Sequence, residues 1–402
     1  MYFDTCEDIL RESIAGDVIP SAAFAIGQGR EVLRSGVMGD RTRFPAPEKA
    51  DRDTLYDLAS LSKLVSTTMV ALRLVEQGRL LLSDTMSRWF TPAELAGAPE
   101  GRADVTVFRL MTHTSGITPH IALWNRTETP EQSAVAHIIL SSEPFCRPGE
   151  QVYYSCMGYI LLQIILERLT GRRLDDLARE YVFAPLGMAH TGYCPESDNV
   201  VTTEYSALYK AYIKGHVHDE NAHFLGGVSG NAGVFAPLDD MIRFAVMCST
   251  HGELPGVAFG TAEGRLLSPC TFAAAIRDYT PGLAEARGLG FQLKPPLPAL
   301  SSAGDLMADG SFGHTGFTGT SLWVDAESGL WGVLLTNAVH FGRDKTAFFR
   351  VRRAFYTAMA AGQGGRHPEK FAQRVPETAV PALDFSKNIH YLELLKQTKY
   401  SF

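Results

Sequence analysis

Segments with strand patterns lie near both ends of this chain, and this placement constrains the fold more than any other feature. The segments are residues 22–26, 31–37, 288–293, 320–324 and 330–336. The first two are separated by a glycine turn, and the last two by the turn Asp325–Gly329, so each pair predicts a hairpin. We therefore expect the two ends of the chain to meet in one antiparallel sheet.

The residues between these segments have mainly helical patterns, separated by loops rich in Gly and Pro. Apolar residues recur at helical spacing over residues 60–77, 130–141, 157–171, 238–249, 270–279 and 344–361. The expected class is α/β (α+β): an antiparallel sheet flanked by helices and built from both chain ends, plus a mainly helical lobe.

Three parts of the chain follow from this pattern. Residues 1–80 and 280–362 would form the sheet domain, residues 81–279 the helical lobe, and residues 363–402 a C-terminal extension, entered through a linker at 362–368. A cleft between two such lobes is a common place for a small-molecule site.

Composition excludes several classes of partner. With 402 residues, 45% of them hydrophobic, the chain can bury a large core. A net charge of −7 and scattered basic residues give no field for nucleic acid, and no apolar run is long enough to span a membrane. The first residues lack the basic and apolar regions of a secretory signal, so a complete chain of this sequence is expected in the cytoplasm.

Ser60 and Lys63 stand three residues apart at the start of the helical pattern over 60–77, which puts both side chains on one face. A serine hydroxyl becomes a good nucleophile when an adjacent base takes its proton. Lysine is such a base only if burial or nearby cations lower its pKa, and a helix N-terminus both disfavours the ammonium and favours an oxyanion. An isolated Ser-x-x-Lys match is weak evidence, because a helix cap and a surface lysine give the same spacing.

Four segments together resemble the class C β-lactamases, the D-alanyl-D-alanine carboxypeptidases and related esterases, over most of residues 20–360. Their fold is the β-lactamase/transpeptidase-like one, which agrees with the class expected from the strand and helix patterns. The segments are Ala59 to Lys63, the nucleophile motif; Leu110 to Ile117, with His-Thr-Ser-Gly; Pro148 to Tyr159, similar to the segment with Tyr-x-Asn; and Gly313 to Gly319, similar to the Lys-Thr-Gly element.

The resemblance implies roles for particular residues. Ser60 would attack a carbonyl to form an acyl-enzyme, Lys63 would accept or relay its proton, and Tyr154 would pass a proton to the leaving group. The backbone N–H groups of Ser60 and Phe317 would form the oxyanion hole. Further residues expected at the substrate are His314, Thr315, Gly316, Cys156 and Asn337.

Two positions depart from the family pattern. Cys156 stands where the family commonly has Asn, and a thiol cannot replace the amide. His314 stands where lactamases usually have Lys, and it carries less positive charge at neutral pH. The acyl-transfer residues are kept while the anchors for a substrate carboxylate are weakened. The sequence therefore favours an esterase-like hydrolase of a small ester or amide.

Two other functions stay open at this point. One is a β-lactamase or D-Ala-D-Ala carboxypeptidase, and the other is a catalytically silent scaffold with the same fold, which the Cys156 departure keeps open. The expected partner is a small ester, amide or β-lactam, with no cofactor, while the oligomeric state is not predicted.

Two further groups of polar residues have structural explanations. The stretch from Gly215 to Ala222 holds ligand types that suit zinc, yet it also resembles a cleft-shaping loop in a branch of the same family, so we expect no metal. His113 is expected to be a loop histidine that bonds to the backbone, and the thiol of Cys156 a buried group rather than a nucleophile.

Overall fold

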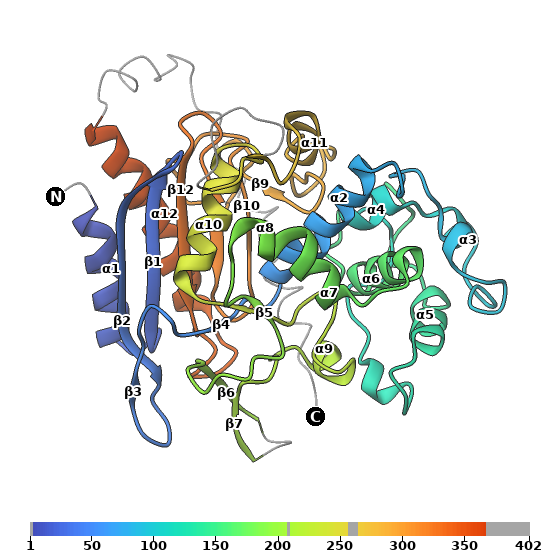
Figure 1. The fold of residues 1–402 in the computed structure, drawn as a ribbon, viewed down its shortest axis with the longest axis horizontal. Coiled ribbons are helices and arrows are strands. Elements are labelled where there is room, and N and C mark those ends of the chain that lie inside the picture. Colours follow the sequence, from blue (N-terminus) through green and yellow to red (C-terminus); the bar gives the residue numbers. More distant parts are fainter. Residues whose placement is uncertain (1–2, 207–209, 256–263, 367–402) are drawn as a thin grey trace.

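The computed structural model describes residues 3–206, 210–255 and 264–366. Its main feature is a seven-stranded sheet with the strand order β3-β2-β1-β12-β11-β10-β9 (Figure 1). Every pairing in this sheet is antiparallel, and β1 from one end of the chain pairs with β12 from the other. The strands are β1 Ser21–Gln28, β2 Glu31–Thr42, β3 Glu48–Lys49, β9 Gln292–Leu293, β10 Phe312–Thr315, β11 Ser321–Val324 and β12 Leu330–Thr336. The predicted antiparallel sheet built from both chain ends is confirmed.

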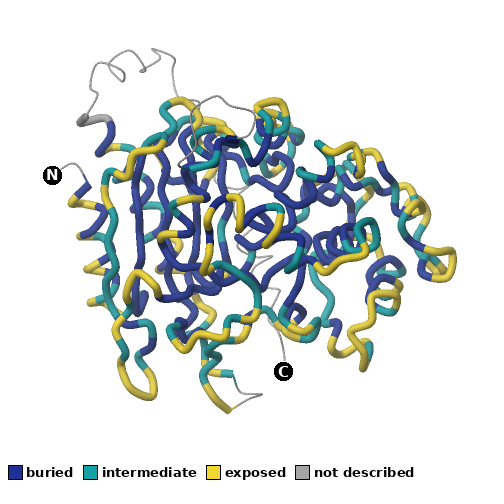
Figure 2. The backbone as a smooth tube through the Cα atoms, viewed as in Figure 1, coloured by how far each residue is buried: buried dark blue, intermediate teal, exposed yellow. Residues whose placement is uncertain are grey.

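Helices cover both faces of the sheet. Helices α1 (Asp4–Ala15) and α12 (Thr346–Arg366) pack together on one face, and α10 (Leu238–Ser249) packs against β1, β11 and β12 on the other. Alternation along β1 explains this, because Phe24 joins the core beneath α1 and α12 while Ala25 joins the core on the opposite side. Both faces of the central strands are therefore buried, as the dark strands of Figure 2 show.

A mainly helical part lies beside the sheet, at the right of Figure 1. Its longest helix is α6 (Cys156–Thr170), which packs against α4 (Val107–Met111) and α5 (Gln132–Leu140). The remaining helices are α2 Met69–Glu76, α3 Met86–Trp89, α7 Leu174–Ala178, α8 Ala184–Leu186, α9 Glu220–Phe224 and α11 Pro269–Ala275, with short turns η1 Lys63–Thr68, η2 Arg102–Asp104, η3 Leu123–Asn125 and η4 Arg179–Phe183. Small sheets are formed by β4 Tyr56–Asp57, β5 Gly192–Tyr193 and β8 Val234–Ala236, and by β6 Thr202–Ser206 with β7 Ala211–Lys214.

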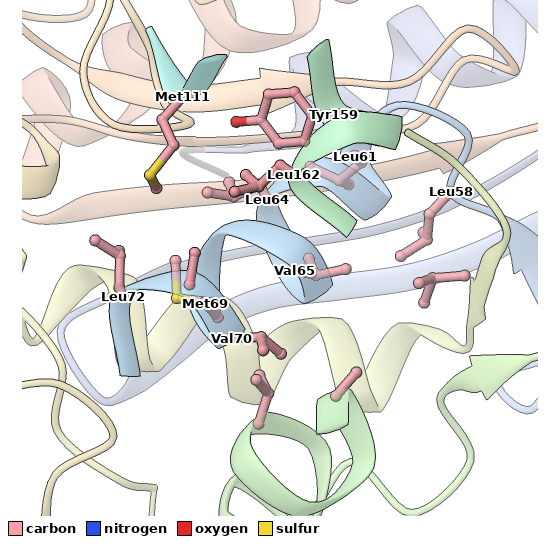
Figure 3. Close-up of a cluster of buried hydrophobic side chains, with 14 of the residues drawn as sticks. Leu58, Leu61, Leu64, Val65, Met69, Val70, Leu72, Met111, Tyr159 and Leu162 are labelled. Atoms are coloured by element: carbon pink, nitrogen blue, oxygen red, sulfur yellow. The ribbon is translucent and has the colours of Figure 1, made fainter. Parts of the chain in front are cut away.

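The helix that follows Ser60 runs through the core between these parts. Its apolar side chains, among them Leu61, Leu64 and Val65, pack with Met111 and Tyr159 in a continuous buried cluster (Figure 3). The predicted helix over 60–77 is thus present, but residues 63–68 form a π-helical turn. Such turns are rare and frequent at functional sites. The polar residues of this turn form hydrogen bonds with other segments. For example, Thr67 Oγ1 donates to the carbonyl of Gly230.

Several boundaries differ from the sequence predictions. The strand expected over 288–293 is reduced to Gln292–Leu293, because residues 287–291 form a bonded loop. The linker was expected at 362–368, but residues 362–366 belong to α12, so this prediction is wrong for them. Residues 367–402 lie outside the described residues. The division into two lobes stays a prediction. The packing of α10 on the sheet favours moving residues 238–249 to the sheet domain.

Among the described residues, we find no helix whose length and apolar character would allow it to cross a bilayer.

Candidate active site

Ser60 lies in the turn that joins β4 to the buried helix. The residue before it, Ala59, has a φ of +46°, in the left-handed region that non-glycine residues rarely adopt. Its N–H donates to the buried carboxylate of Asp57 at 2.8 Å, and the N–H of Leu61 donates to the carbonyl of Leu58 at 3.0 Å. These bonds hold a strained turn directly before the hydroxyl.

The amine of Lys63 lies beside this hydroxyl. Its Nζ is 3.1 Å from Ser60 Oγ, donates to the carbonyl of Asn231 at 2.8 Å, and is 3.4 Å from Cys156 Sγ. No part of the Lys63 side chain reaches solvent. The sequence expected Ser60 and Lys63 to contact each other, and the structure brings them together.

Tyr154 completes this group. Lys63 Nζ lies 4.8 Å from the centre of its ring, and the rings of His113 and His314 lie 4.5 and 5.9 Å from it. Its hydroxyl is buried and makes no hydrogen bond within the described part of the chain. An unpaired buried hydroxyl is costly, so its retention favours a functional role.

Burial and charge act in opposite directions on this group. Burial disfavours the ammonium of Lys63, but attraction to Cys156 and Tyr154 outweighs it and raises the pKa of Lys63. Burial also raises the pKa of Tyr154, while the positive charge of Lys63 lowers it in part. Burial therefore acts in the direction that a general base requires, while Cys156 and Tyr154 act against it. Because the amine and the phenol each shift the pKa of the other, we treat their proton transfers as linked.

His113 positions the segment that carries Tyr154. Its Nδ1 accepts a hydrogen bond from the N–H of Ser155 at 3.1 Å, and its carbonyl accepts one from the N–H of Tyr153 at 2.9 Å. The expected backbone bonds of this histidine are present, and its ring also contacts the ring of Tyr154.

The turn after β10 lies against the turn before Ser60. Thr318 Oγ1 donates to the carbonyl of Asp57 at 2.6 Å, and Thr320 Oγ1 to that of Leu58 at 2.9 Å. Gly316 permits this approach, because a Cβ there would stand 2.3 Å from the Leu58 oxygen.

Two backbone donors in these turns have no partner in the part of the chain that the structure describes. Within the described residues, neither the N–H of Ser60 nor that of Phe317 donates a hydrogen bond to the protein. Free N–H groups on two turns in contact are the donors that an oxyanion hole requires.

The other expected site residues have different outcomes. His314 is buried on β10, and its pKa is far below the usual value because of burial and the positive charges of Arg287 and Lys63, so its ring is neutral. Thr315 is half-buried at the end of the same strand. Cys156 begins α6 and contacts Lys63.

The structure does not bring Asn337 to these residues, which corrects the sequence expectation. Its side chain is fully buried, accepts from Ser21 Oγ, and donates to the carbonyls of Arg41 and Thr202. All of these bonds join the end of β12 to neighbouring segments, so the residue stabilises the fold.

Two residues at this site were not found from the sequence. Asn231 is fully buried, its carbonyl accepts a hydrogen bond from Lys63, and its Oδ1 accepts one from Ser229 Oγ. It lies in the glycine-rich segment over residues 226–233, which follows the stretch that resembles a cleft-shaping loop, and no motif singles it out. The guanidinium of Arg287 lies 5.4 Å from the centre of the Tyr154 ring, and no sequence motif marks it.

The segment that was considered for zinc has other contacts. His218 Nε2 lies 3.1 Å from a carboxylate oxygen of Glu204, its N–H donates to Asp57, and Asp219 caps α9. In the part of the chain that the structure describes, no three His, Cys, Asp or Glu side chains are grouped so that they could hold a metal ion.

Comparison with known proteins gives a consistent result. The family model described as Beta-lactamase matches residues 7–355. A putative D-alanyl-D-alanine carboxypeptidase of Escherichia coli K12 is 28% identical over 322 residues, 73% of this chain and 71% of that protein. An N-acetylmuramyl-L-alanine amidase of Bacillus subtilis 168 is 26% identical over 358 residues, which cover 81% and 75% of the two chains.

A solved structure shows the same fold. It is that of EstCE1, a hydrolase with promiscuous acyltransferase activity, with a TM-score of 0.69 and 21% identity, and the match covers 88% of this chain and 98% of that one.

Proposed function

Because this chain belongs to the Beta-lactamase family of serine hydrolases, we propose that it hydrolyses a small ester or amide through an acyl-enzyme on Ser60. One observation carries the proposal: a fully buried amine, that of Lys63, lies 3.1 Å from the hydroxyl of Ser60. A surface lysine beside a helix cap, the alternative for this spacing, would have its amine in water.

The proposed reaction follows from the contacts. Ser60 Oγ attacks the carbonyl carbon while its proton passes to the unit formed by Lys63 and Tyr154. The oxyanion accepts hydrogen bonds from the free N–H groups of Ser60 and Phe317. Tyr154, whose hydroxyl has no partner among the described residues, then donates a proton to the leaving group. Water attacks the ester on Ser60, the same unit takes its proton and returns it to Ser60 Oγ as the C–O bond breaks, and the acid is released.

The substrate is proposed to be less anionic than a β-lactam or a peptide carboxylate. The ring of His314 is buried and neutral, so β10 supplies no positive charge where the family usually has lysine. Cys156 likewise offers no amide to an acylamino group. These substitutions weaken recognition of an anion but leave the acyl-transfer groups in place.

A second candidate function is that of a β-lactamase or D-Ala-D-Ala carboxypeptidase. The name of the Escherichia coli relative favours it. A silent scaffold is the third candidate, and it has no specific observation in its favour. Location in the cytoplasm stays a prediction.

Two assays separate these functions. The proposal predicts turnover of short-chain p-nitrophenyl esters, lost in Ser60→Ala and kept in the control Ser87→Ala, which changes an exposed serine. Stable labelling of Ser60 by a fluorescent penicillin, together with little or no turnover of the esters, would favour the second candidate. Neither reaction in a folded protein would favour the scaffold.

A further inference from the structure

Arg287 is a buried arginine on the loop between α11 and β9, with only 4% of its surface exposed. Its backbone is fixed from both sides, since its N–H donates to Thr280 Oγ1 at 2.8 Å and its carbonyl accepts from the N–H of Tyr279 at 2.9 Å. Its guanidinium pairs with Glu285, the one carboxylate that bonds to it among the described residues. A buried charge held this firmly needs a reason, because removing it from water is costly.

The guanidinium lies beside the group that the proposed mechanism uses. It lies 5.4 Å from the ring centre of Tyr154, comparable to the 4.8 Å from that centre to Lys63 Nζ, so two cations lie near one phenol. Its charge also lowers the pKa values of both imidazoles beside this ring. The other titratable or charged groups that face the amine and phenol are Cys156, Tyr159, His113, His314 and, further away, Asp219.

We propose that Arg287 is a positioning residue that holds the Tyr154 ring and favours its anionic form, supplying from this loop the positive charge that His314 does not supply. The inference rests on the proposed function and adds to it an electrostatic residue from outside the four recognised motifs. Arg287 acts through Tyr154 and makes no contact with substrate in this scheme.

The sign of the expected pH effect follows from charge. The unit of Lys63 and Tyr154 must lose one proton before it can accept the proton of Ser60. A neighbouring cation favours this less positive form, so the acylation rate rises with pH around a midpoint that Arg287 lowers. Removing the charge moves the midpoint to higher pH by about one unit, which at neutral pH reduces the rate about tenfold.

The test measures the rate at which a fluorophosphonate labels Ser60 across a range of pH. Arg287→Gln is expected to shift the midpoint upward and to approach the wild-type rate at high pH, while Arg287→Lys keeps most of the charge and shifts it less. Glu285→Gln removes the compensating carboxylate and is expected to shift the midpoint downward. Arg102→Gln is the matched control: another buried arginine, bonded to the carbonyls of Ile139 and Ser142, whose loss lowers stability without moving the midpoint.

Equal rate losses at every pH in Arg287→Gln, with an unchanged midpoint, would overturn the inference, since a merely structural role gives that result. The proposed function fails separately, and the inference with it, if the wild type is not labelled or if Ser60→Ala is labelled equally. A second measurement needs no activity: the phenolate absorbance of Tyr154, taken as the difference from Tyr154→Phe, is expected to titrate at higher pH in Arg287→Gln. An unmoved phenolate titration contradicts the inference even when labelling fails.

Discussion

The amine of Lys63 lies 3.1 Å from the hydroxyl of Ser60, and a second contact, to the carbonyl of Asn231 at 2.8 Å, fixes it there. The strained turn at Ala59 presents the hydroxyl, and the buried helix presents the amine. Because the two residues are one turn apart, their contact needs only local structure. The chemistry around them needs segments from much of the chain.

Lys63→Met tests the part played by the amine. The change removes the group that takes the proton of Ser60, so acylation by p-nitrophenyl acetate is expected to fall about 10³-fold. The change also leaves the buried carbonyl of Asn231 without its donor, so the melting temperature should fall moderately while the variant stays folded. Stopped-flow assays measure the acylation rate, and thermal melts measure the melting temperature. A folded Lys63→Met variant that acylates at nearly the wild-type rate would contradict the role of Lys63 as proton acceptor.

Cys156→Asn tests why the chain departs from the family at this position. An amide beside Lys63 is expected to raise labelling by a fluorescent penicillin relative to ester turnover, because it restores a donor for an acylamino group. Cys270→Asn, at an exposed cysteine, is the control. If the ratio of the two activities stays constant in Cys156→Asn, this residue does not set substrate preference.

Gly316→Ala tests the approach of the two turns that carry the oxyanion donors. The added Cβ would stand 2.1 Å from Thr320 Oγ1 and 2.3 Å from the Leu58 oxygen, so the turns must separate. We expect acylation to fall about 10²-fold, the loss typical for one oxyanion donor. Gly192→Ala, where a Cβ would meet nothing within 4 Å, should keep its rate. Comparable rates in both variants would exclude the proposed oxyanion hole.

Glu94 predicts a pH dependence of stability. Its carboxylate accepts hydrogen bonds from Arg168 and from the N–H of Thr91, and chiefly the bond from Arg168 lowers its pKa to about 2. Since the folded pKa is lower than the unfolded one, the stabilisation is complete above the unfolded value and is lost as pH falls toward 2. Glu94→Gln is expected to cost about 2 kcal/mol at pH 7 and less at pH 3, measured by urea unfolding. A cost that is the same at both pH values would contradict this assignment.

Local patterns account for most of what the sequence predicted correctly. The apolar run of β1 and the apolar spacing after Ser60 each depend on neighbouring residues, so the sheet strands and the buried helix were found. The π-helical turn at 63–68 was missed, because its extra residue leaves the apolar spacing nearly unchanged and depends on bonds to distant loops.

Long-range contacts account for what was missed at the site. Arg287 and Tyr154 are more than a hundred residues apart in sequence but lie side by side in the fold. The position of Arg287 depends on backbone bonds to Tyr279 and Thr280. Asn337 was misplaced because its position at the end of a strand does not fix the direction of its side chain. The sequence is the same whether that side chain faces the pocket or Ser21, and in the structure it faces Ser21. Spacing cannot distinguish these directions.

Intact-mass measurement after incubation with a fluorophosphonate tests the central claim most directly, since it asks whether the hydroxyl beside Lys63 is the nucleophile. The account predicts one adduct on the wild type, one on Ser87→Ala and none on Ser60→Ala. An adduct of equal yield on Ser60→Ala, or a folded wild-type protein that gains no mass, would contradict it.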